Sequence, residues 1–536
     1  MAQMRELQGK SAAAGLAQGT LFVPRRLTEA ARVAGNATEE LQALTLAIDA
    51  SVEDLSSLLT NGNAEAAGIV EFQIAMLEDA ELRAPAVEAI NGGKPAEAAW
   101  KSALDTQVAG YEASEDEYFC ARAGDLMDLR DRVLRHLLGT AAETMPAGAI
   151  LFDDEVTPTQ FLEADWRQGG GIALRHGSKT SHVSMLARAT GVPMVIGLGD
   201  VNVAEHRFAQ IDGGSGALIL SPDKAQNDRF DRRLKQAVEA REHGAAYLNE
   251  LAVTADGTTI QVMINIVGPE ELEQIDPNHC DGIGLMRSEF LFRDGEALPD
   301  ENQQYRIYRR ILEWAKGRPV TIRTLDAGGD KPISGVTIND ERNPFLGLRG
   351  LRLSLATPEI FRVQLRALAR AAVHGNLKVM WPMVTLASEL SEAETIMEEV
   401  LAALEREGVA CARPAIGMMV EVPAAAMTLD LFGHAEFFSI GSNDLAQYLM
   451  AAARDNGAVA ELADPTHPAL LRLIDQVVKS CREMGKDLSI CGDMASDPNH
   501  LERLIHLGLR TLSVSPAALG EVKAAIHSLR MGEGGG

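Results

Sequence analysis

Apolar residues recur every three or four positions over long stretches between residues 38 and 139, and almost no proline interrupts them. This period places the apolar side chains on one face of an α-helix. Four stretches show it, and we expect a helix in each: residues 38–60, 64–90, 95–113 and 118–139. The connections are short, which favours antiparallel neighbours. The segment 31–142 is therefore predicted to be a helical bundle.

Short strand-like runs lie on both sides of this bundle. Residues 8–25 hold glycine-punctuated turns and a short apolar run, and residues 146–221 hold further short apolar runs bounded by glycine or proline. We expect both stretches to form one small α/β domain, residues 1–30 and 143–222, that the bundle interrupts. The polar segment 223–250 has a helical period and is predicted to be a helical linker.

Strand and helix patterns alternate regularly through residues 251–536. Strands are predicted at 259–267, 281–286, 319–326, 377–384, 415–421, 436–441, 487–492 and 510–514. Most of them precede a helical segment, and eight such units in about 250 residues are typical of a closed (β/α)8 TIM barrel. The predicted fold class is thus multidomain α/β, ending in a barrel. Active sites of such barrels lie at the carboxyl ends of the strands.

A histidine stands at the start of a predicted helix in the small α/β domain. In KTSHVSMLAR, residues 179–188, an apolar stripe follows His182, and a hydroxyl residue, Thr180 or Ser181, can cap the helix. The free N–H groups and the dipole at a helix start would stabilise a phosphate carried by the imidazole. A capped helix with a partly buried histidine explains the same pattern unless another part of the chain supplies or accepts the phosphate.

The predicted barrel carries complementary polar groups at the carboxyl ends of its strands. They are Arg287, Arg323, Lys331, Arg349, Glu421, Asn443, Asp444, Arg454 and Cys491. Several arginines at one mouth suit a multiply charged oxyanion, because guanidinium forms planar bidentate hydrogen bonds with phosphate and carboxylate. Glu421 and Asp444 would repel each other, which favours a hard divalent cation such as Mg²⁺ between them.

Each of these groups also has a structural explanation when it is taken alone. An arginine can pair with a helix carboxylate, and Glu421 can cap a neighbouring helix. Cys491 in an apolar strand can be a small buried hydrophobic residue. Function is favoured because independent strands deliver complementary groups to the same end of the barrel.

The charge of the chain argues against some classes of partner. A formal net charge of −26 disfavours nucleic acids and anionic membranes, because no basic patch is available to neutralise phosphates. Half of this excess lies between residues 38 and 139, where 20 acidic residues outnumber 7 basic ones. This segment would attract a basic protein, although the solvated faces of surface helices explain the same charge.

The absence of a signal peptide and of a membrane-spanning run predicts a cytoplasmic location. No apolar run is long enough to cross a bilayer, and the first residues, MAQMRELQGK, lack the apolar centre of a signal peptide. The five cysteines, at 120, 280, 411, 481 and 491, have no Cys-x-x-Cys spacing. They indicate neither a disulfide framework nor a zinc site.

Several motifs together resemble those of a known family. In order, they are KTSHVSMLAR, GLMRSEFLF, IRTLDAGGDKP, NPFLGLRGLRLSL, GMMVEVPAAA, FFSIGSNDLAQY and ICGDMASD. This set resembles Enzyme I of the bacterial phosphoenolpyruvate:sugar phosphotransferase system. The likeness runs from GLAQG to beyond LSVSP, which is nearly the whole chain. The wider family of phosphoenolpyruvate (PEP)-utilising enzymes shares the phosphohistidine motif and the barrel.

The resemblance implies a transferase that moves the phosphoryl group of PEP to His182 and releases pyruvate. It implies Mg²⁺ on Glu421 and Asp444, and a proton delivered to the enolate by Cys491. The residues implied to bind the substrate are Arg287, Arg323, Lys331, Arg349, Asn443, Asp444 and Arg454. The phosphoryl group would then pass to a histidine of the phosphocarrier protein HPr, docked on the acidic bundle.

The resemblance further implies a swivel of the phosphohistidine domain between the two sites and a dimer through the barrel. The sugar-transport branch is favoured, but the downstream sugar is not encoded here. Three features depart from the usual pattern. Ser178 replaces a glycine, Asp493 replaces a glutamate, and the chain ends with AALGEVKAAIHSLRMGEGGG, without the longer helical tail of many relatives. They leave open the loop conformation, the surroundings of Cys491 and the strength of the dimer.

Two other functions fit parts of the pattern. One is an ATP-dependent pyruvate phosphate dikinase or PEP synthase, which needs an ATP-binding domain before the histidine. The corresponding residues here are predicted to be helices, without a glycine-rich nucleotide loop. The other is a non-catalytic regulatory protein on the same fold. The joint presence of the histidine, both carboxylates, the arginines and the cysteine argues against it.

Overall fold

The computed structural model describes two compact units, Met1–Ala237 and Val238–Gly536. The division lies inside helix α8 (Lys224–Ala245), in the segment predicted to be a helical linker. The described residues are 3–24, 34–59, 64–112, 117–140, 143–177, 181–292, 298–329, 333, 336–337, 341–453, 459, 462 and 464–530. None of the helices formed by these residues is both long enough and apolar enough to cross a bilayer.

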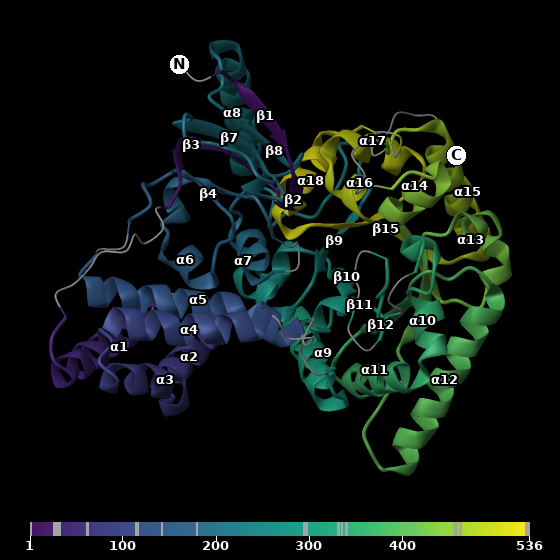
Figure 1. Ribbon diagram of the computed structural model, residues 1–536. Coiled ribbons are helices and arrows are strands. Elements are labelled where there is room, and N and C mark those ends of the chain that lie inside the picture. Colours follow the sequence, from purple (N-terminus) through teal and green to yellow (C-terminus); the bar gives the residue numbers. More distant parts are fainter. Residues whose placement is uncertain are drawn as a thin grey trace. The chain divides into compact units, whose positions relative to one another are not determined.

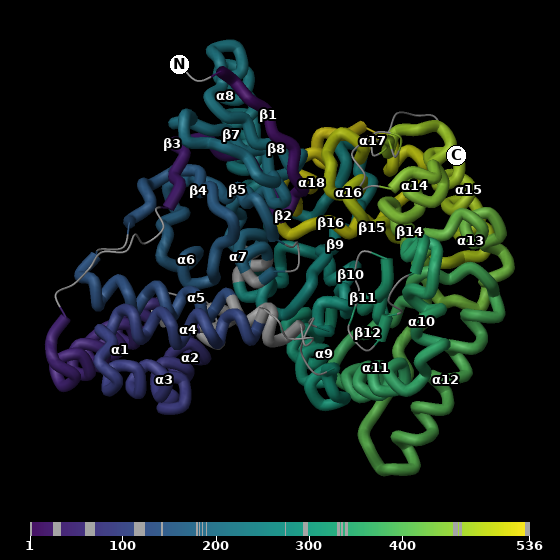
Figure 2. Tube along the Cα trace, in the orientation of Figure 1, coloured from purple at the N-terminus to yellow at the C-terminus, as the bar shows by residue number. Residues whose placement is uncertain are grey.

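A mixed sheet of eight described strands forms the centre of the α/β part of the first unit. Its order is β1-β8-β7-β3-β4-β5-β6-β2. The strands are β1 (Arg5–Gln8), β2 (Lys10–Ala13), β3 (Leu16–Phe22), β4 (Ile150–Asp153), β5 (Gly171–Leu174), β6 (Met194–Ile196), β7 (Phe208–Asp212) and β8 (Ala217–Leu220). In Figure 2 the N-terminal strands lie among strands that follow the bundle, since β3 pairs with both β7 and β4. The residues before and after the bundle therefore build one sheet, as predicted.

The described helices between β3 and β4 lie side by side (Figure 1). They are α1 (Ala37–Leu59), α2 (Ala64–Glu78), α3 (Ala80–Asn91), α4 (Ala96–Glu112) and α5 (Glu117–Leu138). Their apolar faces bury one common core around Trp100. The single helix predicted over 64–90 is wrong, because Asp79 interrupts it. The extended Asp79 backbone breaks the helix, and its side chain accepts a hydrogen bond from the N–H of Glu81, which starts α3.

The second unit contains a closed barrel of eight parallel strands, β9 to β16 in chain order. They are β9 (Gln261–Ile266), β10 (Ile283–Arg287), β11 (Val320–Arg323), β12 (Leu377–Trp381), β13 (Ala415–Val420), β14 (Phe437–Gly441), β15 (Asp487–Cys491) and β16 (Thr511–Val514). The barrel pairs β9 with β16 and so has no free edge. Every strand predicted for this part of the chain is present, which confirms the TIM barrel.

Helices surround the barrel strands (Figure 1). They are α9 (Glu301–Ala315), α10 (Leu351–Ala356), α11 (Pro358–Ala371), α12 (Ala387–Arg406), α13 (Pro423–Met427), α14 (Ser442–Met450), α15 (Pro468–Met484), α16 (Asp493–Ser496), α17 (Pro498–His506) and α18 (Leu519–Ser528). Two strands end three residues earlier than predicted, at Arg323 and Trp381. Pro382 has no N–H to continue β12, and the N–H of Leu325 leaves the ladder for a side-chain acceptor.

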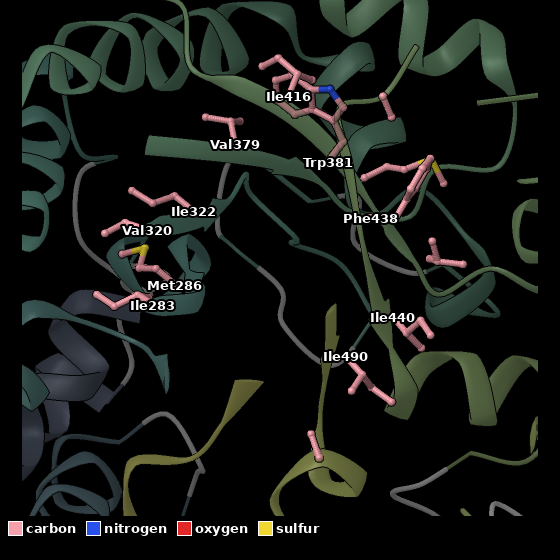
Figure 3. Close-up of a cluster of buried hydrophobic side chains, with 14 of the residues drawn as sticks. Ile283, Met286, Val320, Ile322, Val379, Trp381, Ile416, Phe438, Ile440 and Ile490 are labelled. Carbon is pink, nitrogen blue, oxygen red and sulfur yellow. The ribbon is translucent and has the colours of Figure 1, made fainter. Parts of the chain in front are cut away.

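Side chains of the barrel strands alternate between two buried clusters. Val379 and Trp381 belong to the cluster shared with the surrounding helices (Figure 3), and the Trp381 ring meets that of Phe361 edge to face at 5.5 Å. The other cluster fills the barrel interior and consists of Leu285, Met380, Met419, Phe437 and Cys491. This alternation points every second residue of a strand into the barrel, including the last inward position at its mouth.

The packing inside the barrel predicts a cost for one added methyl group. A Cβ on Gly417 of β13 would lie 2.4 Å from the carbonyl oxygen of Phe437 and 2.6 Å from its ring. We expect Gly417→Ala to lower the free energy of unfolding by about 1–3 kcal/mol, because strand β14 must shift. Urea denaturation measures this.

Gly433→Ala is the matched control for Gly417→Ala. An added Cβ there meets its nearest neighbours at 3.7 and 3.9 Å, which is ordinary contact. We expect its free energy of unfolding to stay within about 0.5 kcal/mol of the wild type. Equal losses in the two variants would contradict the tight interior packing at Gly417.

Candidate active site

The carboxyl ends of the barrel strands bring a set of charged side chains together. Arg323 is the last residue of β11, Glu421 follows β13, and Asp444 lies in the first turn of α14 directly after β14. Because all strands of the barrel are parallel, these ends meet at one mouth. We refer to six of these side chains as the charge cluster: Arg323, Arg349, Glu289, Asp326, Glu421 and Asp444. All six side chains are buried.

Arg323 is held by two carboxylates. Its Nη2 donates to Glu289 Oε1 at 2.7 Å and lies 3.0 Å from Asp326 Oδ2. Burial by itself would lower the pKa of this guanidinium, but Glu289 and Asp326 outweigh burial and raise it above the ordinary value. Arg323 therefore stays charged in the folded protein. Its Nε is buried without a hydrogen-bond partner and is left for a ligand.

Arg349 binds Asp326 from the other side. Its Nε and Nη2 donate to the two oxygens of Asp326 at 3.2 and 2.9 Å, and its Nη1 and Nη2 lie 3.4 Å from the oxygens of Asp444. Nη1 also donates to the Tyr448 hydroxyl at 3.0 Å, which donates in turn to the Phe345 carbonyl at 2.6 Å. Burial would lower the pKa of Arg349, yet Asp326 and Asp444 raise it. Arg349 thus links two carboxylates of the cluster.

Glu421 has one engaged and one unengaged oxygen. Its Oε1 accepts from the N–H of Met383 at 2.7 Å, and Met383 holds a left-handed backbone with φ 57°, which is unusual for a residue other than glycine. Its Oε2 is buried without a hydrogen-bond partner. Burial raises the pKa of Glu421 to about 7, and Asp444 and Asp326 add to the rise, whereas the guanidinium groups oppose it.

The donor set at Glu421 and Asp444 fits a hard divalent cation. Mg²⁺ is usually held by one or two carboxylates, while substrate oxygens and water complete its coordination. Glu421 offers a buried unpartnered oxygen, and Asp444 lies close enough to raise the pKa of Glu421. No group of three or more His, Cys, Asp and Glu ligands occurs among the described residues. The carboxylate pair would therefore share the ion with substrate and water.

Asn443 and Cys491 line the same mouth. Asp493 contacts both ends of the Asn443 amide: its N–H donates to Oδ1 at 3.1 Å and its Oδ2 accepts from Nδ2 at 3.2 Å. Asp493 thus fixes the orientation of that amide. The Cys491 thiol is 3% exposed and donates to the carbonyl of Ile440 at 3.4 Å. Burial raises the pKa of Cys491 to about 11, so the thiol carries its proton at neutral pH.

Arg287 differs from the other arginines of the mouth. It ends β10, is half-buried and lies near enough to Cys491 to influence the thiol. No hydrogen bond or ion pair joins the Arg287 side chain to any residue that the structure describes. Its guanidinium is therefore available to a ligand, unlike that of Arg349.

The helix that begins at His182 has the predicted construction. Helix α7 (His182–Thr190) follows Ser181, whose side chain accepts a hydrogen bond from the N–H of Ser184 at 3.2 Å. Its apolar stripe is buried, and the helix ends at Gly191 in the left-handed conformation. The side chain of His182 lies outside the described part of the chain, as do Ser178, Lys331 and Arg454.

Comparison with known proteins identifies the family. Three models of the PEP-utilising enzymes match: the PEP-binding domain over residues 241–531, the N-terminal domain over 8–122 and the mobile domain over 145–216. This chain belongs to the PEP-utilising enzymes. The finding confirms the resemblance seen in the sequence motifs, and the chain is therefore an enzyme.

Curated relatives of the chain share one printed name, phosphoenolpyruvate-protein phosphotransferase. The protein of Priestia megaterium is 34% identical over 98% of this chain and 94% of its own length. That of Lactococcus lactis subsp. lactis is 35% identical over the same shares. That of Geobacillus stearothermophilus is 36% identical over 93% of this chain and 88% of its own length. The similarity thus extends over all three matched domains.

Sequence reasoning missed several residues of this mouth. Glu289 and Asp326 stand inside the quoted motifs, two or three residues after a strand end, and this position is the signal that could have found them. Tyr448 lies one helical turn after Asp444 on the same face of α14. The helical spacing from Asp444 is therefore a second sequence signal, and it could have placed Tyr448 at the mouth. Met383 gave no signal, because its role rests on a backbone N–H and a left-handed backbone.

Removal of the carboxylate that Arg323 and Arg349 share should destabilise the barrel. Asp326→Asn leaves both guanidinium groups buried with one negative charge fewer. We expect the free energy of unfolding to fall by about 3–5 kcal/mol, as when one partner of a buried ion pair is removed. Urea denaturation followed by tryptophan fluorescence measures the loss.

Asp487→Asn is the control for a carboxylate in the same barrel. Asp487 is 86% exposed and lies 3.7 Å from Lys378, a surface pair that contributes about 0–1 kcal/mol. Its replacement should leave the unfolding curve nearly unchanged. An Asp326→Asn protein as stable as the wild type would contradict the electrostatic dependence of the two arginines on Asp326.

Proposed function

We propose that this enzyme transfers the phosphoryl group of PEP to His182, releases pyruvate, and passes the phosphoryl group on to a histidine of HPr. This is the first step of the phosphotransferase system. One observation carries the proposal: a mouth with available guanidinium groups and an unpartnered carboxylate oxygen occurs in a PEP-utilising enzyme that also has a capped helix starting at a histidine. The curated relatives, named phosphoenolpyruvate-protein phosphotransferases, support it.

The substrate phosphate would bind to Arg287 and Arg323, with Asn443 as a further donor. Arg287 has no partner among the described residues, and Arg323 Nε is buried without one, which supports a ligand at this place. Lys331 and Arg454, from the family motif, would complete the set. Arg349 would act differently: its donors already bind Asp326, Asp444 and Tyr448, so it would orient Asp444 beside the substrate.

Glu421 and Asp444 would hold Mg²⁺ with oxygens of PEP. When bound, the ion would neutralise charge on the substrate phosphate and on the developing enolate. Together with the arginines, the ion would supply positive charge around the substrate phosphate. Positioning and charge neutralisation of this kind supply most of the acceleration in phosphoryl transfer.

The chemical steps follow from the two candidate catalytic residues. Nε2 of neutral His182 forms a bond to phosphorus while the bond from phosphorus to the enol oxygen breaks, and the electron pair stays on that oxygen. The enolate of pyruvate then takes a proton at carbon 3 from the Cys491 thiol, which regains one from water. The raised pKa of Cys491, about 11, keeps the thiol protonated for this step.

HPr would dock on the acidic helices α1 to α5, whose excess of carboxylates suits a basic partner surface. The phosphohistidine domain, residues 1–30 and 143–222, would swivel about the linker 223–250 between the PEP site and HPr. We further propose a cytoplasmic enzyme of the sugar-transport branch that forms a dimer through the barrel domain, residues 251–536.

Labelling with PEP tests the acceptor. With Mg²⁺ and PEP labelled at phosphorus, the wild type should gain acid-labile, base-stable label and release pyruvate in equal amount, and HPr should then remove the label. His182→Ala should gain none. His176→Ala, an exposed histidine in the same domain, should label as the wild type does. Label on His182→Ala, or pyruvate formation that needs ATP, would sink the proposal.

Replacement of the thiol tests the proton donor. Cys491→Ala should release pyruvate at least about 100-fold more slowly in a single turnover, because water must protonate the enolate. Cys481→Ala is the control, since that thiol is also buried, has its pKa raised to about 12, and lies on α15 in the outer cluster. A wild-type rate in Cys491→Ala would exclude the role of the thiol.

A further inference from the structure

A fully buried glutamine lies behind the charge cluster. Gln364 is in the middle of α11 and is 1% exposed. Its Oε1 accepts from the N–H of Leu325 at 2.9 Å, and its Nε2 donates to the Ser288 hydroxyl at 3.0 Å and to the Tyr308 hydroxyl at 3.1 Å. One acceptor and both amide hydrogens are thus used. A buried amide with every bond made has one orientation only.

Two of these bonds reach the ends of neighbouring barrel strands. Ser288 directly follows β10 and stands between Arg287 and Glu289. Leu325 follows β11, where the ladder to β12 has already ended, and its N–H binds the amide oxygen of Gln364 instead of a strand. Its neighbour is Asp326. One side chain therefore holds the two loops that carry a free arginine and two carboxylates of the charge cluster.

The third bond leads away from the mouth. The Tyr308 hydroxyl donates to Gln304 Oε1 at 3.0 Å, and Gln304 Nε2 donates to the carbonyl of Pro299 at 2.9 Å. Tyr308 and Gln304 are fully buried on α9. Gln304 is thus a second buried glutamine of the same network, but its hydrogen bonds within the described structure reach neither of the two strand ends. Gln364 and Gln304 are therefore a matched pair for comparison, because both are buried glutamines of one network and only Gln364 is hydrogen-bonded to the strand ends.

We propose that Gln364 is a positioning residue for PEP binding, which fixes the ends of β10 and β11 so that Arg287 and Arg323 face the phosphate together. The inference rests on the proposed function. Arg287 has no partner of its own in the described structure, so its place depends on the backbone beside Ser288. The Glu289 and Asp326 carboxylates that hold Arg323 are fixed through the same two loops.

The experiment compares Gln364→Met with Gln304→Met. Both variants remove a buried amide of the same network and keep the length of the side chain. The rate of the first turnover of pyruvate release is measured against PEP concentration. In Gln364→Met, half-saturation should need about tenfold more PEP, which corresponds to about 1.4 kcal/mol of binding, while the limiting rate changes less than about threefold. Gln304→Met should need the wild-type concentration.

A second readout does not depend on PEP. Hydrogen exchange of the Leu325 amide should speed up about tenfold or more in Gln364→Met, because its acceptor is gone, and stay unchanged in Gln304→Met. If the wild type gains no label on His182, the proposed function is wrong. The expected change in exchange of the Leu325 amide does not depend on that outcome. The positioning role is overturned if both variants raise half-saturation equally, or if Gln364→Met does not raise it.

A smaller change covers the case in which Gln364→Met does not fold. Ser288→Ala removes one hydroxyl and cuts the bond between Gln364 and the end of β10. Half-saturation should then need about threefold more PEP, with the Leu325 amide still protected by Gln364. An unchanged PEP requirement in folded Ser288→Ala protein would overturn the inference.

Discussion

The barrel mouth depends on the balance of buried charge. The cluster holds two guanidinium groups, Arg323 and Arg349, among four carboxylates, so the four negative charges exceed the two positive ones by two when all are ionised. Buried charges are costly unless they are paired. The two arginines pair with Glu289 and Asp326, and the excess remains around Glu421 and Asp444. A doubly charged cation would cancel it there, which is the physical reason for expecting a metal between these two residues.

Strand register delivers these charges to one place. Arg323, Glu421 and Cys491 occupy inward positions at strand ends, while the preceding residues Ile322 and Ile490 belong to the outer apolar cluster. A slip of one residue would exchange the two faces and bury apolar side chains at the mouth. The same alternation that builds the core therefore also builds the site, and the arrangement of charges needs no separate folding signal.

The sequence predicted these features to the extent that they follow from local pattern. Apolar runs of strand length revealed the barrel, and the residues after those runs revealed Glu421 and Asp444. The break at Asp79 was missed because the apolar period continues across it, although a capping aspartate ends one helix and starts the next. The pairing of Arg349 with Asp326 and Asp444 was missed for another reason. Asp326 and Asp444 lie 23 and 95 positions away, so the folded barrel alone brings them into contact.

Sequence alone also does not show which arginines have hydrogen-bond donors left for a ligand and which have their donors paired within the protein. Arg287 ends β10 and Arg349 lies in the segment after β11, yet the Arg287 side chain has no partner in the described structure and that of Arg349 has three. Gln364 is a similar case with a neutral side chain. In the sequence it is a polar residue inside an amphipathic helix. In the fold its side chain accepts a hydrogen bond from the N–H of Leu325, which no longer pairs with a strand. In each case the difference lies in which hydrogen-bond donors and acceptors are already paired within the protein. A ligand can bind only those that are still unpaired.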